Sequence, residues 1–221
     1  MTLAPDEARG GFVTQLKDFA ELVSSLSADD LERTTSFHGW SVHALAGHVV
    51  GTMSDVLAGR VQALDSFDVA HRQASERSDY TTAKLVEELA EASACLTVML
   101  QAMSVEDWAS PAPGDFEGTV TDAISALTFD VVIHASDIRG ALSQPPDASS
   151  QSLRTAVAHV ARELSERRWG PATVVLAGFD PFLIIGESAE HRTVVADALD
   201  FVLAAGGLRD EPHLDLVEPV R

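Results

Sequence analysis

The sequence predicts a mainly α-helical protein, a four-helix bundle with a small α+β extension at its C-terminal end. Three observations predict this fold class. Apolar residues recur at intervals of three and four along four long segments in the first two thirds of the chain, which is the spacing of one buried helix face. Polar, proline- and glycine-containing stretches separate these segments. Two short β-branched runs follow Trp169, and such runs favour strands.

The first two predicted helices cover residues 7–25 and residues from 41 to about 57. Ser41 is the predicted N-cap of the second, because a serine hydroxyl can accept a hydrogen bond from the first helical turn. The polar residues Ser27, Asp29 and Asp30 end the first pattern. Residues 66–80 are polar and mixed, and we predict a loop there. The apolar faces consist of Phe12, Leu16, Phe19, Leu22 and Val23, and of Val42, Leu45, Val49, Met53, Val56 and Leu57.

The third and fourth helices are predicted to begin near residue 81 and near residue 119, and the fourth ends before the two prolines of "SQPPDASS". Residues 110–118 form the loop between them. A fifth helix is expected over 150–168, two strands over 172–178 and 181–188, and a last helix over 191–205. The apolar faces of the third and fourth helices are Leu85, Leu89, Leu96, Leu100 and Met103, and Val120, Ile124, Leu127, Val131, Ile138 and Leu142.

The charge of the chain argues against two classes of partner. With 221 residues and a net charge of −19, the protein lacks the excess of Lys and Arg that binding to nucleic acid or to an anionic membrane requires. No run of about 18 apolar residues is present, and the first residues, "MTLAPDEARGG", do not resemble a signal peptide. We therefore expect a cytoplasmic protein.

Cys95 is the single cysteine of the chain, which excludes an intrachain disulfide and a thiolate metal cluster. It lies in the apolar helical stretch "ASACLTVML". Buried thiols in such surroundings behave as small apolar side chains, so we predict that Cys95 is buried and unreactive.

A candidate metal site follows from the fourth helix. In "LTFDVVIHASDIRG", Asp130 and His134 are four residues apart, which places both side chains on one flank of the helix with Cβ atoms about 6 Å apart. His48, in "GWSVHALAGHVVG", flanks the apolar face of the second helix. Two imidazoles and one carboxylate form a common catalytic zinc site and also suit nickel or iron(II). The alternatives stay open that His48 is a packed histidine and that Asp130 and His134 form a surface ion pair.

The same two segments resemble a known family. "GWSVHALAGHVVG" is similar to the "G-W-[ST]-V-x-x-x-x-x-H" opening of the second helix in the DinB-like superfamily, in its mycothiol-dependent maleylpyruvate isomerase-like branch, and "FDVVIHASDIRGA" is similar to the fourth-helix segment of that branch. The resemblance covers about residues 5–145. It implies that His48, Asp130 and His134 are metal ligands. Asp137 would match the acidic residue that follows the ligand histidine, where it could orient His134 or be a plain surface carboxylate.

The resemblance also implies a domain division and a chemistry. Residues 1–145 would be the metal-binding bundle and 146–221 a small α+β region packed on it. The expected function is that of a metal-dependent isomerase or S-transferase that uses mycothiol or a similar thiol, whose thiolate adds to a small electrophilic substrate. Zinc is the metal expected first, and Ni²⁺ and Fe²⁺ stay open, as does a homodimer. A hydrolase with the same ligands would need a proton shuttle that the sequence does not identify.

Two departures from the family pattern keep a second interpretation open. Asp130 replaces the usual Glu, which shortens the ligand arm, and Ser136 stands where a tryptophan is common. These changes favour the alternative of a non-catalytic metal- or ligand-binding bundle with a degenerate site.

Few other polar residues suggest a role in the site. His38 and His43 are predicted to lie in a loop and in a first helical turn, beside the site at most. His71, His159, His191 and His213 occupy polar or terminal contexts. The candidate cations for a carboxylate substrate are Arg60, Arg139 and Arg209, although Arg139, five residues past His134, should point away from it.

Overall fold

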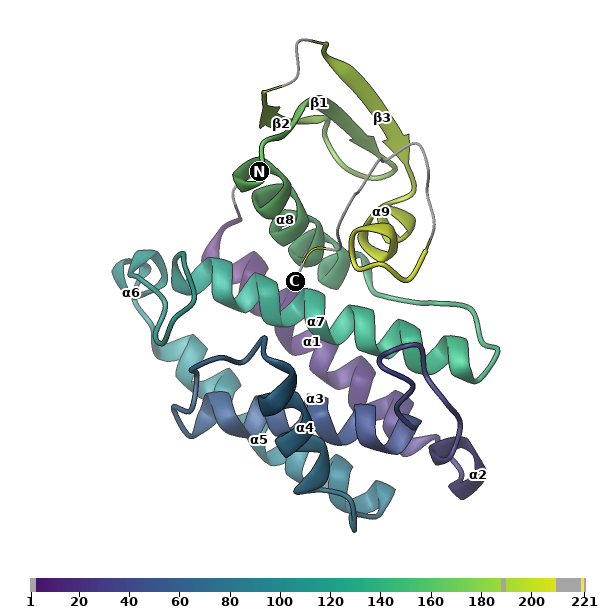
Figure 1. Ribbon diagram of the computed structural model, residues 1–221. Coiled ribbons are helices and arrows are strands. Elements are labelled where there is room, and N and C mark those ends of the chain that lie inside the picture. The colour runs from purple at the N-terminus through teal and green to yellow at the C-terminus, as the bar shows by residue number, and fades with distance from the viewer. Residues whose placement is uncertain (1–2, 188–189, 210–219, 221) are drawn as a thin grey trace.

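The computed structural model describes residues 3–187, 190–209 and 220, and it confirms the predicted fold class. Four long helices form the bundle, and a small sheet with two further helices lies against one side of it (Figure 1). Around the bundle, each long helix contacts two others in the cyclic order α1, α5, α3, α7. These helices are α1 (Pro5–Ser24), α3 (Val42–Leu57), α5 (Thr82–Ala102) and α7 (Val120–Ala141).

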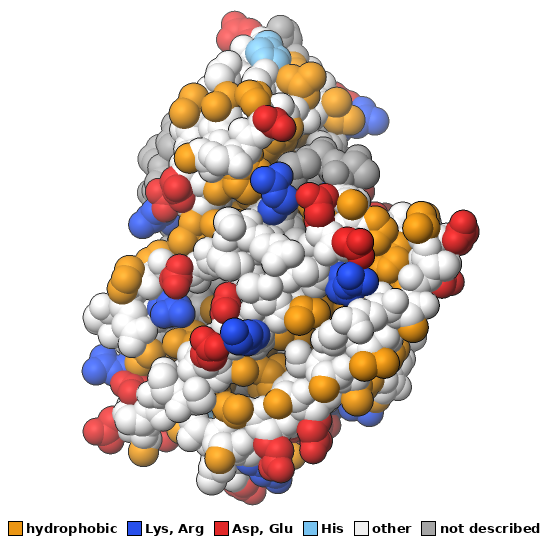
Figure 2. Space-filling view, turned by 180° about the vertical axis from the view of Figure 1, so that it is seen from behind, with side chains coloured by type: hydrophobic (Ala, Val, Ile, Leu, Met, Phe, Trp, Pro, Cys, Tyr) orange, Lys and Arg blue, Asp and Glu red, His pale blue; other side chains and the backbone are white. Residues whose placement is uncertain are grey.

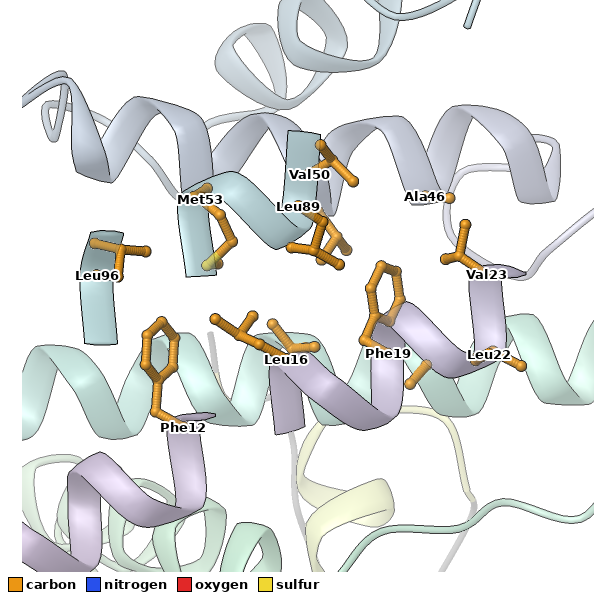
Figure 3. Packing of buried hydrophobic residues seen from close by; sticks show 14 of the residues in the cluster. Phe12, Leu16, Phe19, Leu22, Val23, Ala46, Val50, Met53, Leu89 and Leu96 are labelled. Atoms are coloured by element: carbon orange, nitrogen blue, oxygen red, sulfur yellow. The ribbon is translucent and has the colours of Figure 1, made fainter. Parts of the chain in front are cut away.

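The predicted apolar faces meet in one core between these helices. From α1, Phe12, Leu16 and Phe19 point toward α3 and α5 (Figure 3), and at most 1% of each of the three residues is exposed. On the facing helices Met53 and Leu89 are equally buried. Burial of large side chains of this kind contributes about 1.5–3 kcal/mol each, so this core accounts for the arrangement of the bundle.

The helix starts agree with the predicted caps. The Ser41 hydroxyl accepts a hydrogen bond from the backbone N–H of Ala44, and Thr119 forms a reciprocal capping box with Asp122. Each cap satisfies a backbone donor that the helix itself leaves unpaired. Two short helices, α2 (Ala28–Leu31) and α6 (Val105–Ala109), lie in the connections.

The predicted loop over residues 66–80 is wrong in part, because it contains α4 (Phe67–Ser75). Ser66 caps this helix through the backbone N–H of Val69. Its buried residues are Ala70, Gln73 and Ala74. The segment is short and mostly polar, and its apolar residues at helical spacing, Phe67, Ala70 and Ala74, are too few to have predicted a helix. Helix α4 packs on α3 (Figure 1).

The C-terminal region contains α8 (Ser150–Glu166), a three-stranded sheet and α9 (Ala198–Ala205). The strands are β1 (Trp169–Leu176), β2 (Phe182–Gly186) and β3 (Arg192–Ala196), in the order β2-β1-β3. β1 pairs antiparallel with β2 and parallel with β3. The two predicted strands are confirmed.

The helix predicted over 191–205 is wrong in its first half, which forms β3. Thr193, Val194 and Val195 are β-branched, and such side chains suit a strand better than a helix. Asp197 then caps α9 by accepting hydrogen bonds from the backbone N–H groups of Leu199 and Asp200.

A second hydrophobic cluster joins α7 and α8 to the sheet and α9. Helix α7 contributes to both clusters: Val131 and Ile138 belong to the bundle core, whereas Phe129 and Val132 pack against Val160 of α8 and the C-terminal elements. Because two of its sides are buried, α7 is a rigid element on which to mount functional side chains.

The prediction that Cys95 is buried is wrong: the residue is exposed. It precedes Leu96 of the core face by one position, and one position turns a side chain about 100° around a helix. On the face seen from behind, acidic and basic side chains alternate with apolar ones (Figure 2). No helix among the described residues is long and apolar enough to span a membrane.

Candidate metal centre

His48 of α3 and Asp130 and His134 of α7 lie together, although 82 residues separate His48 from Asp130 in the sequence. One possible ligand atom from each lies within 4.8 Å of the other two. The imidazole centroids of His48 and His134 are 5.1 Å apart, and His134 Nε2 is 3.1 Å from Asp130 Oδ1. Two imidazole nitrogens and one carboxylate oxygen at this spacing could hold a divalent metal ion.

The His48 imidazole is buried and held in the neutral form. Only 4% of the residue is exposed. Burial, followed by the neighbouring His134, lowers the pKa of His48 to about 4, although Asp130 and Gln73 oppose this. A neutral imidazole has a free lone pair, which metal binding requires.

Asp130 and His134 form a pair one helical turn apart. Burial raises the pKa of the Asp130 carboxyl, but the charge and hydrogen bond of His134 outweigh this effect and leave the pKa below its ordinary value. Asp130 therefore offers an ionised oxygen at neutral pH. Its side chain is 38% exposed, whereas that of His134 is 5% exposed, so the cluster is open to solvent on the Asp130 side.

Asp137 is not a surface carboxylate, and the hydrogen bonds of its carboxylate go to the segment before α3. Only 7% of the residue is exposed. Its Oδ1 accepts hydrogen bonds from the Ser36 backbone N–H and hydroxyl at 2.9 and 2.7 Å, and its Oδ2 accepts one from the Phe37 backbone N–H at 2.9 Å. The carboxylate thus fixes the segment before α3 against α7.

Phe37, held in this way, covers both histidines of the cluster. Its ring is parallel to that of His48, with centroids 6.0 Å apart, and meets His134 edge-on at 4.9 Å. The next residues form a tight turn in which His38 and Gly39 both have positive φ, and Trp40 N–H donates to the Phe37 carbonyl. This turn accounts for the Gly39 of the motif, because a left-handed conformation suits glycine.

Further rings surround the cluster. Trp40 lies 6.3 Å from His48 and 5.7 Å from Phe67, which begins α4. His38 contacts Phe67 at 4.8 Å, and His71 lies 6.3 Å from Trp40. His38 and His71 are thus at the rim of the site, outside the candidate ligand set. These rings cover the cluster on the His48 side, whereas the Asp130 side stays open to solvent.

Other predicted residues lie elsewhere. His43 Nε2 is 2.7 Å from the Tyr80 carbonyl oxygen, and His191 is exposed and bonded to Thr173 on the sheet. Arg60 pairs with Asp55, and Arg209 with Asp200. Arg139 is partly buried, Ser136 is buried at 6% exposure, and His213 lies outside the described residues.

His159 departs from the polar context expected for it. It is buried at 2% exposure and lies 5.0 Å from Phe129 in ring-centroid distance. It is also close enough to contribute to lowering the pKa of Asp130. His159 lines a cavity of about 380 Å³ between α6, α8 and the start of α7, together with Trp108, Ser125 and Arg162. The three candidate ligands do not line this cavity.

The sequence did not indicate the polar group behind His48. Gln73 Oε1 is 2.7 Å from His48 Nδ1, and Gln73 Nε2 donates to Asp55 Oδ2 at 2.7 Å. Gln73 is fully buried. In the short, mostly polar α4 no signal in the sequence marked Gln73, whereas the helical spacing places Asp55, seven residues past His48, on the same side of α3.

Residues 12–139 match the family described as "Mycothiol maleylpyruvate isomerase N-terminal domain". The chain belongs to this family. The matched range contains all three candidate ligands and α4, so the resemblance seen in the two motifs is confirmed. No curated protein matches the chain by sequence.

Solved structures confirm the fold over nearly the whole length. The crystal structure of the mycothiol-dependent maleylpyruvate isomerase is similar with a TM-score of 0.65 and 16% identity, over 95% of this chain and 93% of that one. A histidine-to-alanine mutant of the mycothiol-dependent maleylpyruvate isomerase gives a TM-score of 0.59 and 15% identity, over 93% and 92% of the two chains. The likeness therefore includes α8, α9 and the sheet, which the family match does not reach.

Proposed function

We propose that this protein is a cytoplasmic, metal- and mycothiol-dependent enzyme of the maleylpyruvate isomerase type, acting on a small electrophile as an isomerase or S-transferase. The observation that carries the proposal is the cluster of His48, Asp130 and His134 inside a domain of the mycothiol maleylpyruvate isomerase family. The names of the two similar structures support the choice of thiol and reaction class.

The residues present fit a divalent metal. Two imidazoles and one carboxylate from two rigid helices match a catalytic site with three protein ligands, and the neutral His48 and ionised Asp130 are in the protonation states that binding needs. When bound, the metal would lower the pKa of a coordinated thiol, so that the thiolate exists at neutral pH. Zinc suits this donor set, as do Ni²⁺ and Fe²⁺.

The chain supplies orientation and exclusion of water around this site. His48 and His134 project from buried positions on two different helices, and Phe37 covers both rings. Asp130 is the most accessible member of the cluster, so thiol and electrophile would approach from its side. In this proposal residues 1–145 provide the metal-binding bundle and residues 146–221 the small α+β region that packs on it.

Metal content tests the proposal. Wild-type protein purified without added metal, and the variants His48→Ala and His134→Ala, would be compared by plasma mass spectrometry. His191→Ala is the matched control, because His191 is exposed on the sheet. We expect about one equivalent of zinc or a similar ion in wild type and in the control, and loss of the ion in both site variants. The metal-loaded wild type should then isomerise maleylpyruvate only when mycothiol is present.

Two results would contradict the proposal. Wild type that stays empty after incubation with zinc, nickel or iron(II) would leave a degenerate, non-catalytic bundle. Stoichiometric metal without any mycothiol-dependent turnover, tested on maleylpyruvate and on other small electrophiles, would leave a metal-binding protein without this chemistry.

A further inference from the structure

A buried polar chain runs from His48 away from the candidate ligand set. His48 Nδ1 is 2.7 Å from Gln73 Oε1, Gln73 Nε2 is 2.7 Å from Asp55 Oδ2, and Asp55 is bonded to Arg60 and Arg72. His48, Gln73 and the Asp55 side chain are between 0 and 4% exposed. In these surroundings each donor must face an acceptor, since an unpaired buried polar group is costly.

The ionised state of Asp55 determines which group donates and which accepts in each of these hydrogen bonds. Burial raises the pKa of the Asp55 carboxyl, but hydrogen bonds from Arg72, Gln73 and Arg60 leave it below its ordinary value. Arg72 Nη2 is 2.5 Å from Oδ2, and Arg60 Nη2 is 2.6 Å from Oδ1. An ionised carboxylate only accepts hydrogen bonds.

The orientation of the Gln73 amide follows from the carboxylate. Its NH₂ group must face Asp55, because the reverse orientation would place two oxygen acceptors against each other. Gln73 Oε1 must then face His48. A second donor, the Thr52 hydroxyl, lies 3.2 Å from the same oxygen. His48 therefore carries its proton on Nδ1 and keeps the lone pair of Nε2 free.

The side chain of Gln73 lies close against the backbone of α3 at Gly51. A Cβ atom at Gly51 would lie 2.6 Å from Gln73 Cβ and 2.7 Å from Arg77 Nη1. Any larger residue at this position would push α4 away from α3. The glycine at position 51 thus permits the short distance that lets the amide reach the imidazole.

We propose that Gln73, oriented by Asp55, is a positioning residue that fixes the tautomer and ring angle of His48 so that Nε2 is presented to the metal. This inference rests on the proposed role of His48 as a ligand. Groups of this kind behind a metal-binding histidine commonly change metal affinity by about 10–100-fold when they are removed.

The experiment uses the tautomer of His48 in the metal-free protein and the affinity for Zn²⁺. Nitrogen-15 NMR of histidine-labelled full-length protein near pH 7 distinguishes an Nδ1–H from an Nε2–H imidazole, and His48→Gln identifies the His48 signals. Wild type should show the Nδ1–H form. Gln73→Leu, of similar size, and Asp55→Asn, which frees the amide to turn, should lose this preference and raise the Kd for Zn²⁺ about 10–100-fold by calorimetry.

Ser54→Ala is the matched control. It removes a hydroxyl from the same helix that donates to Glu88, so it should leave the tautomer and the Kd unchanged. Should Gln73→Leu fail to fold, the His48 tautomer and the Kd for Zn²⁺ of Asp55→Asn test the proposal by themselves. An Nε2–H tautomer in wild type, or an unchanged tautomer and Kd in the folded variants, would overturn the proposal. A tautomer that follows Gln73 in a protein without zinc affinity would support the positioning and contradict the metal centre.

Discussion

Helix α3 has two buried sides that differ in kind. One side places Leu45, Val49 and Met53 in the apolar core of the bundle, and the other places His48, Thr52 and Asp55 against α4. Contacts on the apolar side depend on volume and are not directional. On the polar side each contact depends on which atom donates and which accepts. The apolar side therefore contributes stability through buried volume, whereas the polar side also determines the protonation state and the tautomer of His48.

The largest effect is expected in the apolar core that this side of α3 faces. Phe12→Ala should lower the free energy of unfolding by about 3–5 kcal/mol, because Phe12 is fully buried and its removal leaves a cavity. The affinity of the folded protein for Zn²⁺ should not change. Urea denaturation and calorimetry measure the two quantities.

Phe67→Ala is the matched control for Phe12, since Phe67 is 47% exposed. We expect a loss of less than about 1.5 kcal/mol for it. Loss of zinc affinity in folded Phe12→Ala protein would contradict the division between the two sides of α3.

The second effect is a pH dependence from the polar side. The folded-state pKa of His48, about 4, lies below the ordinary value of 6.5, so between these values the unfolded chain binds the proton and the folded one does not. The stability of the metal-free protein should therefore fall as pH decreases from about 6.5 to 4, by on the order of 3 kcal/mol from this group. Below pH 4 its contribution should change no further.

The measurement is a series of urea denaturations between pH 4 and 7.5. Carboxylates titrate in part of this range, and His134 and Asp130 face His48, so the quantity to compare is the difference between wild type and His48→Gln, whose amide stays neutral. A difference that is independent of pH would show that His48 is accessible to protons in the folded state.

The third effect concerns the segment that covers the histidines. Asp137→Asn should destabilise the protein by about 2 kcal/mol, because the Asp137 carboxylate accepts three hydrogen bonds from Ser36 and Phe37. Ser36→Ala removes only the hydroxyl donor and should cost less than about 1 kcal/mol. Equal losses in the two variants would indicate that the backbone N–H bonds contribute little.

Sequence patterns predicted the apolar side of α3 better than the polar side. The spacing of Phe12, Leu16 and Phe19 predicted α1, and that of Leu45, Val49 and Met53 predicted α3. Such patterns indicate which side chains are buried. The geometry of Asp130 and His134 could also be predicted, since both are on one helix.

The missing parts of the site depend on contacts between segments. Gln73 lies on a short helix whose other buried residues are two alanines, and hydrophobic spacing does not show which polar residue of a helix faces its neighbour. Asp137 was expected beside His134 from its position on α7, yet its partners come from residues about 100 positions away. Which of two near neighbours donates a hydrogen bond to a carboxylate depends on how whole helices pack. The spacing of residues within one helix does not determine that packing.

The smallest effect is expected at Cys95, where local composition gave the wrong prediction. Because Cys95 is exposed on α5, Cys95→Ser should change the free energy of unfolding by less than about 0.5 kcal/mol. The native thiol should react with Ellman's reagent nearly as fast as in urea-unfolded protein. The opposite result would be a thiol that reacts only after unfolding, together with a loss of unfolding free energy above about 1 kcal/mol in the serine variant. It would show that Cys95 is buried in the apolar core. The boundary of that core on α5 would then lie one residue further round the helix.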